Sequence, residues 1–122
     1  MDGWLTLPDV AERLGTDVGS VRQMVADRDL LALRGEDRIL RVPERFLVPA
    51  DDRWHVVPAL RGTLVLLADA GFSDEEAVRW LFEPDASLTG VAGPGGAVPA
   101  PVDALVAGHK TEIRRRAQAL AL

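Results

Sequence analysis

The side chains best suited to binding chemistry lie on one face of a predicted helix near residue 20. Arg22 and Gln23 carry long hydrogen-bond donors, and Gly19 and Ser20 are small. Small residues permit close approach to the wall of a DNA groove, and long donors reach base edges or phosphates. An ordinary solvated helix face has the same appearance, and this helix alone favours neither interpretation.

A strand–turn–strand is predicted directly after this helix. Residues 30–33 and 39–42 are rich in β-prone side chains, and residues 34–38 (RGEDR) have the composition of a turn. A hairpin that follows a recognition helix is the wing of a winged helix. The order of the elements therefore favours nucleic-acid binding.

Three arginines decorate the predicted wing. Arg34, Arg38 and Arg41 suit contacts with phosphates or with the minor groove. Glu36 and Asp37 at the tip would repel a phosphate backbone, so we expect the arginines to contact DNA and the tip to stand off. The alternative is a solvated, charged hairpin.

Two short helices precede the wing. Thr6 and Asp9 have the spacing of a capping box, and Gly15 is a suitable helix end. Apolar residues recur at helical spacing in the first helix: Leu7, Val10, Ala11 and Leu14. Thr16 or Asp17 caps a second helix that runs to about residue 27 and packs through Val18, Val21, Met24 and Val25. A tight turn between such helices is typical of a helix-turn-helix.

The second half of the chain is predicted to be helical. A helix begins near Pro58 with Leu60, Leu64 and Leu67 on one face, and Ser73 with Glu76 forms a second capping box. After a Gly/Pro-rich loop at residues 89–100, a short helix begins at Pro101. The last helix carries an apolar stripe of Ile113, Ala117 and Leu120. Its basic segment (residues 109–116) suits either DNA phosphates or solvent.

Several segments resemble known families. LTLPDVAERLG at residues 5–15 and VRQ at 21–23 resemble the start of MerR-type and excisionase-type winged helices. GFSDEE (71–76), RWLFEPDASL (79–88), PVDAL (101–105) and RRAQA (115–119) resemble an actinobacterial family of winged-helix DNA-binding proteins. Its mycobacterial member is a substrate of a serine/threonine protein kinase. The wing here looks one residue longer, and the tail on which phosphorylation would act is not evident.

The resemblance implies a mainly α fold with a small β-hairpin wing. A winged helix-turn-helix domain would occupy residues 1–48, and a family-specific helical domain residues 57–122, with residues 49–56 as a connector. The implied activity is binding of double-stranded DNA by a transcriptional regulator. The DNA-contacting residues would be Gly19, Ser20, Arg22, Gln23, Arg34, Arg38 and Arg41.

A second resemblance gives the alternative function. Trp80, Leu81 and Pro84, together with the PVDAL segment, resemble the C-terminal module of a class of bacterial antitoxins. The chain would then be a protein-interaction module whose C-terminal helices bind a partner such as a toxin.

Composition excludes other classes. The chain of 122 residues has no cysteine, which excludes disulfides and thiolate chemistry and suits a cytoplasmic protein. His55 and His109 lack neighbours at metal-ligand spacing, and no nucleophile or nucleotide motif appears, so we expect no enzyme, no metal and no cofactor. No signal peptide or membrane span is visible. The net charge of −5 weighs against DNA binding, but the local field decides docking.

Overall fold

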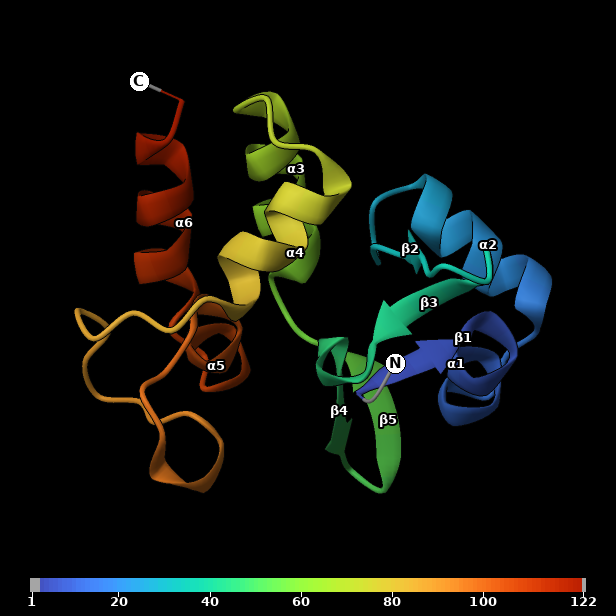
Figure 1. Ribbon diagram of the computed structural model, residues 1–122. Coiled ribbons are helices and arrows are strands. Elements are labelled where there is room, and N and C mark those ends of the chain that lie inside the picture. Colours follow the sequence, from blue (N-terminus) through green and yellow to red (C-terminus); the bar gives the residue numbers. More distant parts are fainter. Residues whose placement is uncertain (1–2, 122) are drawn as a thin grey trace. The chain divides into compact units, whose positions relative to one another are not determined.

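A computed structural model describes residues 3–121, which form two compact units that divide between Arg61 and Gly62. The N-terminal unit combines two helices with two small antiparallel sheets (Figure 1). Its elements are β1 (Trp4–Thr6), α1 (Leu7–Leu14), α2 (Val18–Ala26), β2 (Leu33–Arg34), β3 (Leu40–Pro43), the 3-10 turn η1 (Glu44–Phe46), β4 (Leu47–Ala50) and β5 (Arg53–Val56).

Both N-terminal helices form where their caps predict. The Thr6 hydroxyl accepts a hydrogen bond from the Asp9 N–H at 3.3 Å, and the Asp17 carboxylate accepts one from the Ser20 N–H at 2.7 Å. Each bond satisfies a backbone donor that the first helical turn would leave unpaired. Gly15 ends α1 with a φ of 70°, in the left-handed region that glycine adopts without steric cost.

The wing belongs to a sheet of three strands, where the sequence predicts a two-stranded hairpin. β1 pairs with β3, placing Leu5 opposite Val42, and β3 pairs with β2, placing Leu40 opposite Arg34. The wing strands are also shorter than expected, because residues 30–32 are buried but extend into no strand. β1 was missed because three residues directly before a helix cap are too few to show a β-period.

A second hairpin replaces the connector predicted at residues 49–56. β4 and β5 pair with Ala50 opposite Arg53, so that Asp51 and Asp52 form a two-residue turn with φ of 55° and 64°. Two positive φ angles define a type I′ turn, for which Asn-Gly or Asp-Gly is the usual signal. The Asp-Asp pair does not give that signal, and the prediction of a connector was therefore wrong.

The N-terminal core is formed where these elements meet. Val10, Val21, Val42 and Phe46 are fully buried. They come from α1, α2, β3 and the turn after β3, so one apolar core holds the helix-turn-helix against the wing sheet. Burial of such side chains is the main force that fixes these short elements in place.

The C-terminal unit is helical, as predicted. Its elements are α3 (Leu60–Asp69), whose first turn contains the division between the units, α4 (Asp74–Phe82), the 3-10 turn η2 (Pro94–Gly96), α5 (Pro101–Val106) and α6 (Lys110–Ala119). The capping box of Ser73 and Glu76 is present in full. α3 begins two residues later than expected, because Ala59 has a φ of 68° and cannot belong to a right-handed helix.

The C-terminal core confirms most of the predicted apolar faces. Leu64, Leu67, Ile113 and Ala117 are buried. Leu120 was also expected on the buried stripe of the last helix, but it is 39% exposed because α6 ends at Ala119. Among residues 3–121, no helix combines the length and the apolar character needed to span a bilayer.

Candidate nucleic-acid interface

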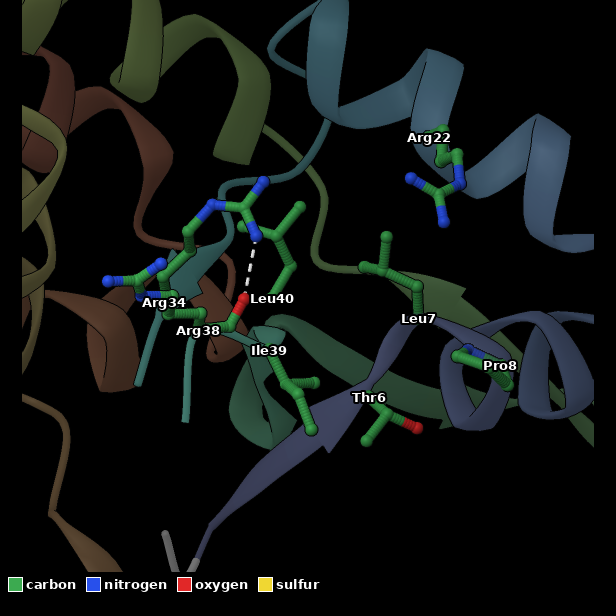
Figure 2. A pocket seen from close by; sticks show the side chains of 8 residues that line it. All are labelled: Thr6, Leu7, Pro8, Arg22, Arg34, Arg38, Ile39 and Leu40. Carbon is green, nitrogen blue, oxygen red and sulfur yellow. Dashed lines mark hydrogen bonds between the residues drawn. The ribbon is translucent and has the colours of Figure 1, made fainter. Parts of the chain in front are cut away.

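One shallow hollow in the N-terminal unit gathers arginines from α2 and from the wing. It has a volume of about 240 Å³. Figure 2 shows its lining, which comes from the β1–α1 junction, from α2 and from the two sides of the wing turn: Thr6, Leu7, Pro8, Arg22, Arg34, Arg38, Ile39 and Leu40. Three of the seven residues predicted to contact DNA therefore lie around the same open surface.

The predicted outer face of α2 is exposed. Val21 is fully buried beneath the helix, and Gly19, Ser20, Arg22 and Gln23 are all exposed. Both the N–H and the side chain of Ser20 are hydrogen-bonded to the Asp17 carboxylate, at an exposed position of the helix. The Gln23 side-chain amide donates to the Asp27 carboxylate at 3.0 Å, one helical turn on. α2 thus presents small and long polar side chains together.

The wing turn fixes its arginines through the backbone. The N–H of Gly35 donates to the carbonyl of Ile39 at 3.2 Å, and the N–H of Arg38 donates to the carbonyl of Gly35 at 2.9 Å. Arg38 closes this turn with a φ of 65°. This left-handed conformation is energetically unfavourable for residues other than glycine, asparagine and aspartate. The Arg34 guanidinium donates to the Arg38 carbonyl at 2.7 Å, the dashed line in Figure 2.

Two guanidinium groups on this surface have no protein partner. Within residues 3–121, neither the Arg22 nor the Arg38 guanidinium makes a hydrogen bond or an ion pair. Arg34 bonds only a neutral carbonyl and pairs with no carboxylate of the described residues. The hollow therefore carries positive charge that nearby carboxylates do not neutralise, which suits an anionic ligand.

Arg41 does not line this hollow but lines a neighbouring one on the wing, together with Arg34 and Asp37. It lies on β3 next to Leu40, and strand alternation directs these two side chains to opposite faces of the sheet. There its guanidinium donates two hydrogen bonds to the Asp37 carboxylate, at 3.0 and 2.8 Å. These bonds, with one from the Ile39 N–H, lower the pKa of Asp37 to about 2, and the Asp37 bond raises the pKa of Arg41.

The structure also adds residues that the sequence did not single out. Ile39 is 47% exposed and lines the hollow, and Thr6 and Pro8 line it from the β1–α1 junction. Thr6 lies beside the wing because β1 pairs with β3, with Thr6 opposite Arg41. The pairing of β1 with β3, which the sequence analysis missed, is the signal that would have placed Thr6 next to the wing.

The residues proposed for partner binding have different environments. Leu81 is fully buried in the C-terminal unit, Trp80 is half-buried and Pro84 is exposed. Leu81 therefore packs inside its own unit. PVDAL at residues 101–105 is buried throughout, and the Asp103 carboxylate accepts a hydrogen bond from the Ala100 N–H at 2.7 Å.

Two arginines of the basic segment of the last helix, Arg115 and Arg116, are paired within the C-terminal unit. Arg116 donates to the carboxylates of Glu112 and Asp85 and to both the hydroxyl and the carbonyl of Ser87. Arg115 also pairs with Glu112. The segment thus holds the chain around Ser87 against α6. In the described part of the chain, no group of three or more histidine or acidic side chains is placed to hold a metal ion.

The fold and the exposed helix define the class of the N-terminal unit. A strand, two helices joined by a tight turn, and a two-stranded wing after the second helix constitute a winged helix-turn-helix. Residues 2–47 match the family model described as "DNA-binding protein Rv2175c, wHTH domain". Residues 57–121 match the one described as "Rv2175c C-terminal domain of unknown function". The chain belongs to the Rv2175c family.

A curated relative and a solved structure agree with this assignment. The chain is 42% identical over 118 residues to the DNA-binding protein Rv2175c of Mycobacterium tuberculosis (strain ATCC 25618 / H37Rv), covering 94% of this chain and 78% of the relative. It also resembles the NMR structure of Rv2175c, with a TM-score of 0.82 and 38% identity. That match covers 98% of this chain and 81% of the solved chain.

Proposed function

We propose that this protein binds double-stranded DNA and regulates transcription, with α2 in the major groove and the wing on the backbone. The observation that carries the proposal is the shared hollow of Arg22, Arg34 and Arg38, in which two guanidinium groups lack a protein partner within residues 3–121. The description of the related protein as DNA-binding supports it.

The α2 residues would read the groove. Arg22 and Gln23 reach toward base edges, and Gly19 and Ser20 allow the helix to approach the groove wall. Gln23 would exchange its bond with Asp27 for one with a base, which makes Arg22 the stronger determinant of sequence preference. An arginine that donates two bonds to one guanine is the commonest specific contact in DNA recognition.

The wing arginines would hold the phosphate backbone. Arg34 and Arg38 lie on the side of the wing that faces the α2 hollow, so DNA docked on α2 would meet both. Binding that depends on so few cations is sensitive to salt, because each neutralised phosphate releases about 0.9 counterion. We expect the logarithm of the binding constant to fall with the logarithm of the salt concentration with a slope of about −2 to −3 per chain.

Titration of a fluorescent duplex, followed by anisotropy at several salt concentrations, tests this proposal. If Arg22 reads a base, Arg22→Ala costs about 1–3 kcal/mol and reduces the preference between sequences. Arg38→Ala weakens binding to all sequences equally and reduces the salt slope by about one. Arg53→Ala is the matched control, since Arg53 is exposed in the same unit but does not line the hollow.

Parental affinity in both Arg22→Ala and Arg38→Ala would show that this face is not the interface. A regulatory role requires a further test in the host. Genome-wide footprinting of the tagged protein should find discrete sites upstream of genes, and Arg22→Ala should lose that distribution. Uniform coverage of the chromosome would contradict regulation while leaving DNA binding intact.

A further inference from the structure

The tip of the wing contains a tightly held ion pair on a surface proposed to meet DNA. Asp37 accepts two hydrogen bonds from the Arg41 guanidinium, and the Arg41 side chain is only 19% exposed. The Asp37 side chain is 47% exposed, so its carboxylate remains near any ligand of the wing. This two-bond geometry is the strongest arrangement that arginine and a carboxylate form.

Asp37 is fixed to the turn as well as to Arg41. Its carboxylate also accepts the Ile39 N–H at 3.0 Å, and this bond anchors it to the backbone of the wing. Glu36, the neighbouring acid, has no partner among residues 3–121, and Arg38 keeps its guanidinium unpaired. Of the three wing arginines, Arg41 is therefore paired with a carboxylate, whereas Arg34 and Arg38 pair with no carboxylate of the described residues.

A paired arginine contributes little to DNA binding. Counterion release requires a cation that neutralises a phosphate, and a guanidinium that is already neutralised by a carboxylate must give up that partner first. A phosphate approaching Arg41 also meets the negative charge of Asp37. Arg41 shares a hollow with Arg34, which also lines the α2 hollow, so it lies beside the proposed DNA surface while Asp37 neutralises its charge.

On the basis of the proposed function, we infer that Asp37 lowers the sequence-independent affinity for DNA by keeping Arg41 from the phosphate backbone. Arg22 on α2 is separate from this pair and keeps its role in base reading. Weak backbone affinity allows a regulator to leave non-specific sites, because non-specific binding is essentially electrostatic. The acidic wing tip, which looks unsuitable for a DNA-binding protein, then acts to limit that affinity.

The test uses the full chain and a fluorescent duplex of random sequence, with the dissociation constant measured across a salt series. Asp37→Asn removes the charge but keeps an oxygen that can accept the Ile39 N–H bond. It should tighten binding by about fivefold to tenfold near 0.1 M salt and steepen the salt slope by about 0.9, as one added phosphate contact requires. Asp37→Ser, a second variant that can keep the backbone bond, should act in the same direction.

Two controls separate release of Arg41 from loss of a negative charge. Glu36→Gln removes the same charge from the adjacent position without breaking the Asp37–Arg41 pair, and it should give a smaller gain and a smaller change in slope. Asp37→Asn combined with Arg41→Ala should return binding to within about twofold of the parent, because a neutral pair is removed as a whole.

The outcomes are distinguishable. If the parent chain binds the duplex but Asp37→Asn binds no tighter than Glu36→Gln, the inference is overturned and the proposed function stands. The same holds if the double variant keeps the gain, or if it binds much more weakly than the parent, which would mean that Arg41 already contacts DNA. Absence of salt-dependent binding by the parent overturns both.

Discussion

The guanidinium of Arg13 lies over the ring of Trp54, 4.7 Å from its centre. This contact joins α1 to β5, so the second hairpin packs on the first helix of the helix-turn-helix. The Glu44 carboxylate is 3.1 Å from Arg13 Nη1 on the same guanidinium. That nitrogen is buried and makes no hydrogen bond within residues 3–121, so Glu44 acts on it through charge rather than through bond geometry.

Trp54→Ala should destabilise the N-terminal unit by about 2 kcal/mol, because it removes half-buried aromatic surface together with the cation–π contact. Trp54→Phe should recover about half of this loss, since it keeps an aromatic face under Arg13. Hydrogen exchange at the Val57 N–H, which bonds the Phe46 carbonyl, measures the effect locally. Unchanged exchange in Trp54→Ala would mean that the hairpin is stable without α1.

Arg38→Gly should shift stability and DNA affinity in opposite directions. Glycine relieves the left-handed backbone at this position and should raise the free energy of unfolding by about 1 kcal/mol. The same change removes a guanidinium from the hollow and should weaken DNA binding. Urea denaturation and anisotropy titration measure the two effects separately. Arg38→Asn, which tolerates the same backbone, is the matched control, and a loss of stability in both variants would contradict this account.

Acid should weaken the wing through Asp37. Its pKa is about 2 in the folded chain, held down first by the Arg41 hydrogen bonds and then by the Ile39 N–H, against an ordinary value of 3.8. A lowered folded pKa means that the contribution to stability is present above about pH 4 and is lost as the pH falls toward 2. The difference in unfolding free energy between the parent and Asp37→Asn should therefore narrow over this range.

Four other carboxyl groups also have lowered pKa values because they accept hydrogen bonds. Their partners are Ser20 for Asp17, Ser73 for Glu76, Ser87 for Asp85, and Arg116 and Arg115 for Glu112. The parent and Asp37→Asn should thus both lose stability in acid, and only the difference between their unfolding free energies reports on Asp37. A difference that stays constant from pH 5 to pH 2 would contradict the assignment.

Arg116→Ala should loosen the chain around Ser87 from α6. The guanidinium makes hydrogen bonds to Asp85, to Glu112 and to Ser87, and the side chain is only 26% exposed. We expect a loss of about 1–2 kcal/mol, since several bonds disappear but each is partly solvated. Arg116→Lys keeps the charge without the forked donors and should restore less than half. Thermal unfolding followed by circular dichroism provides the measurement, and full restoration by lysine would show that charge alone matters.

The starts of α1, α2 and α4 were predictable because each begins at a local signal. Thr6, Asp17 and Ser73 cap helices within three residues of the donors that they satisfy, and these pairs can be read from the chain directly. The exposure of Arg22 follows from helical spacing once those ends are known. β1 was not predictable in this way, since its pairing with β3 joins Trp4 to Pro43, far along the sequence.

The wing arginines illustrate the same distinction. Composition placed Arg34, Arg38 and Arg41 on a hairpin, but it could not tell which face each would occupy. That depends on the left-handed residue Arg38, which shifts the alternation between the turn and β3. Composition also could not show that Arg41 is paired with Asp37, a contact that neutralises one of the three positive charges of the wing.

The β4–β5 hairpin affects how this protein should be divided for experiments. Residues 48–56 lie outside both matched family regions, so a recombinant fragment designed from those limits would end near residue 47. Such a fragment would lack Trp54 and would expose the side of α1 that the indole covers. A fragment that extends through residue 61 would retain Trp54. DNA-binding measurements on the N-terminal unit alone should therefore use this longer fragment.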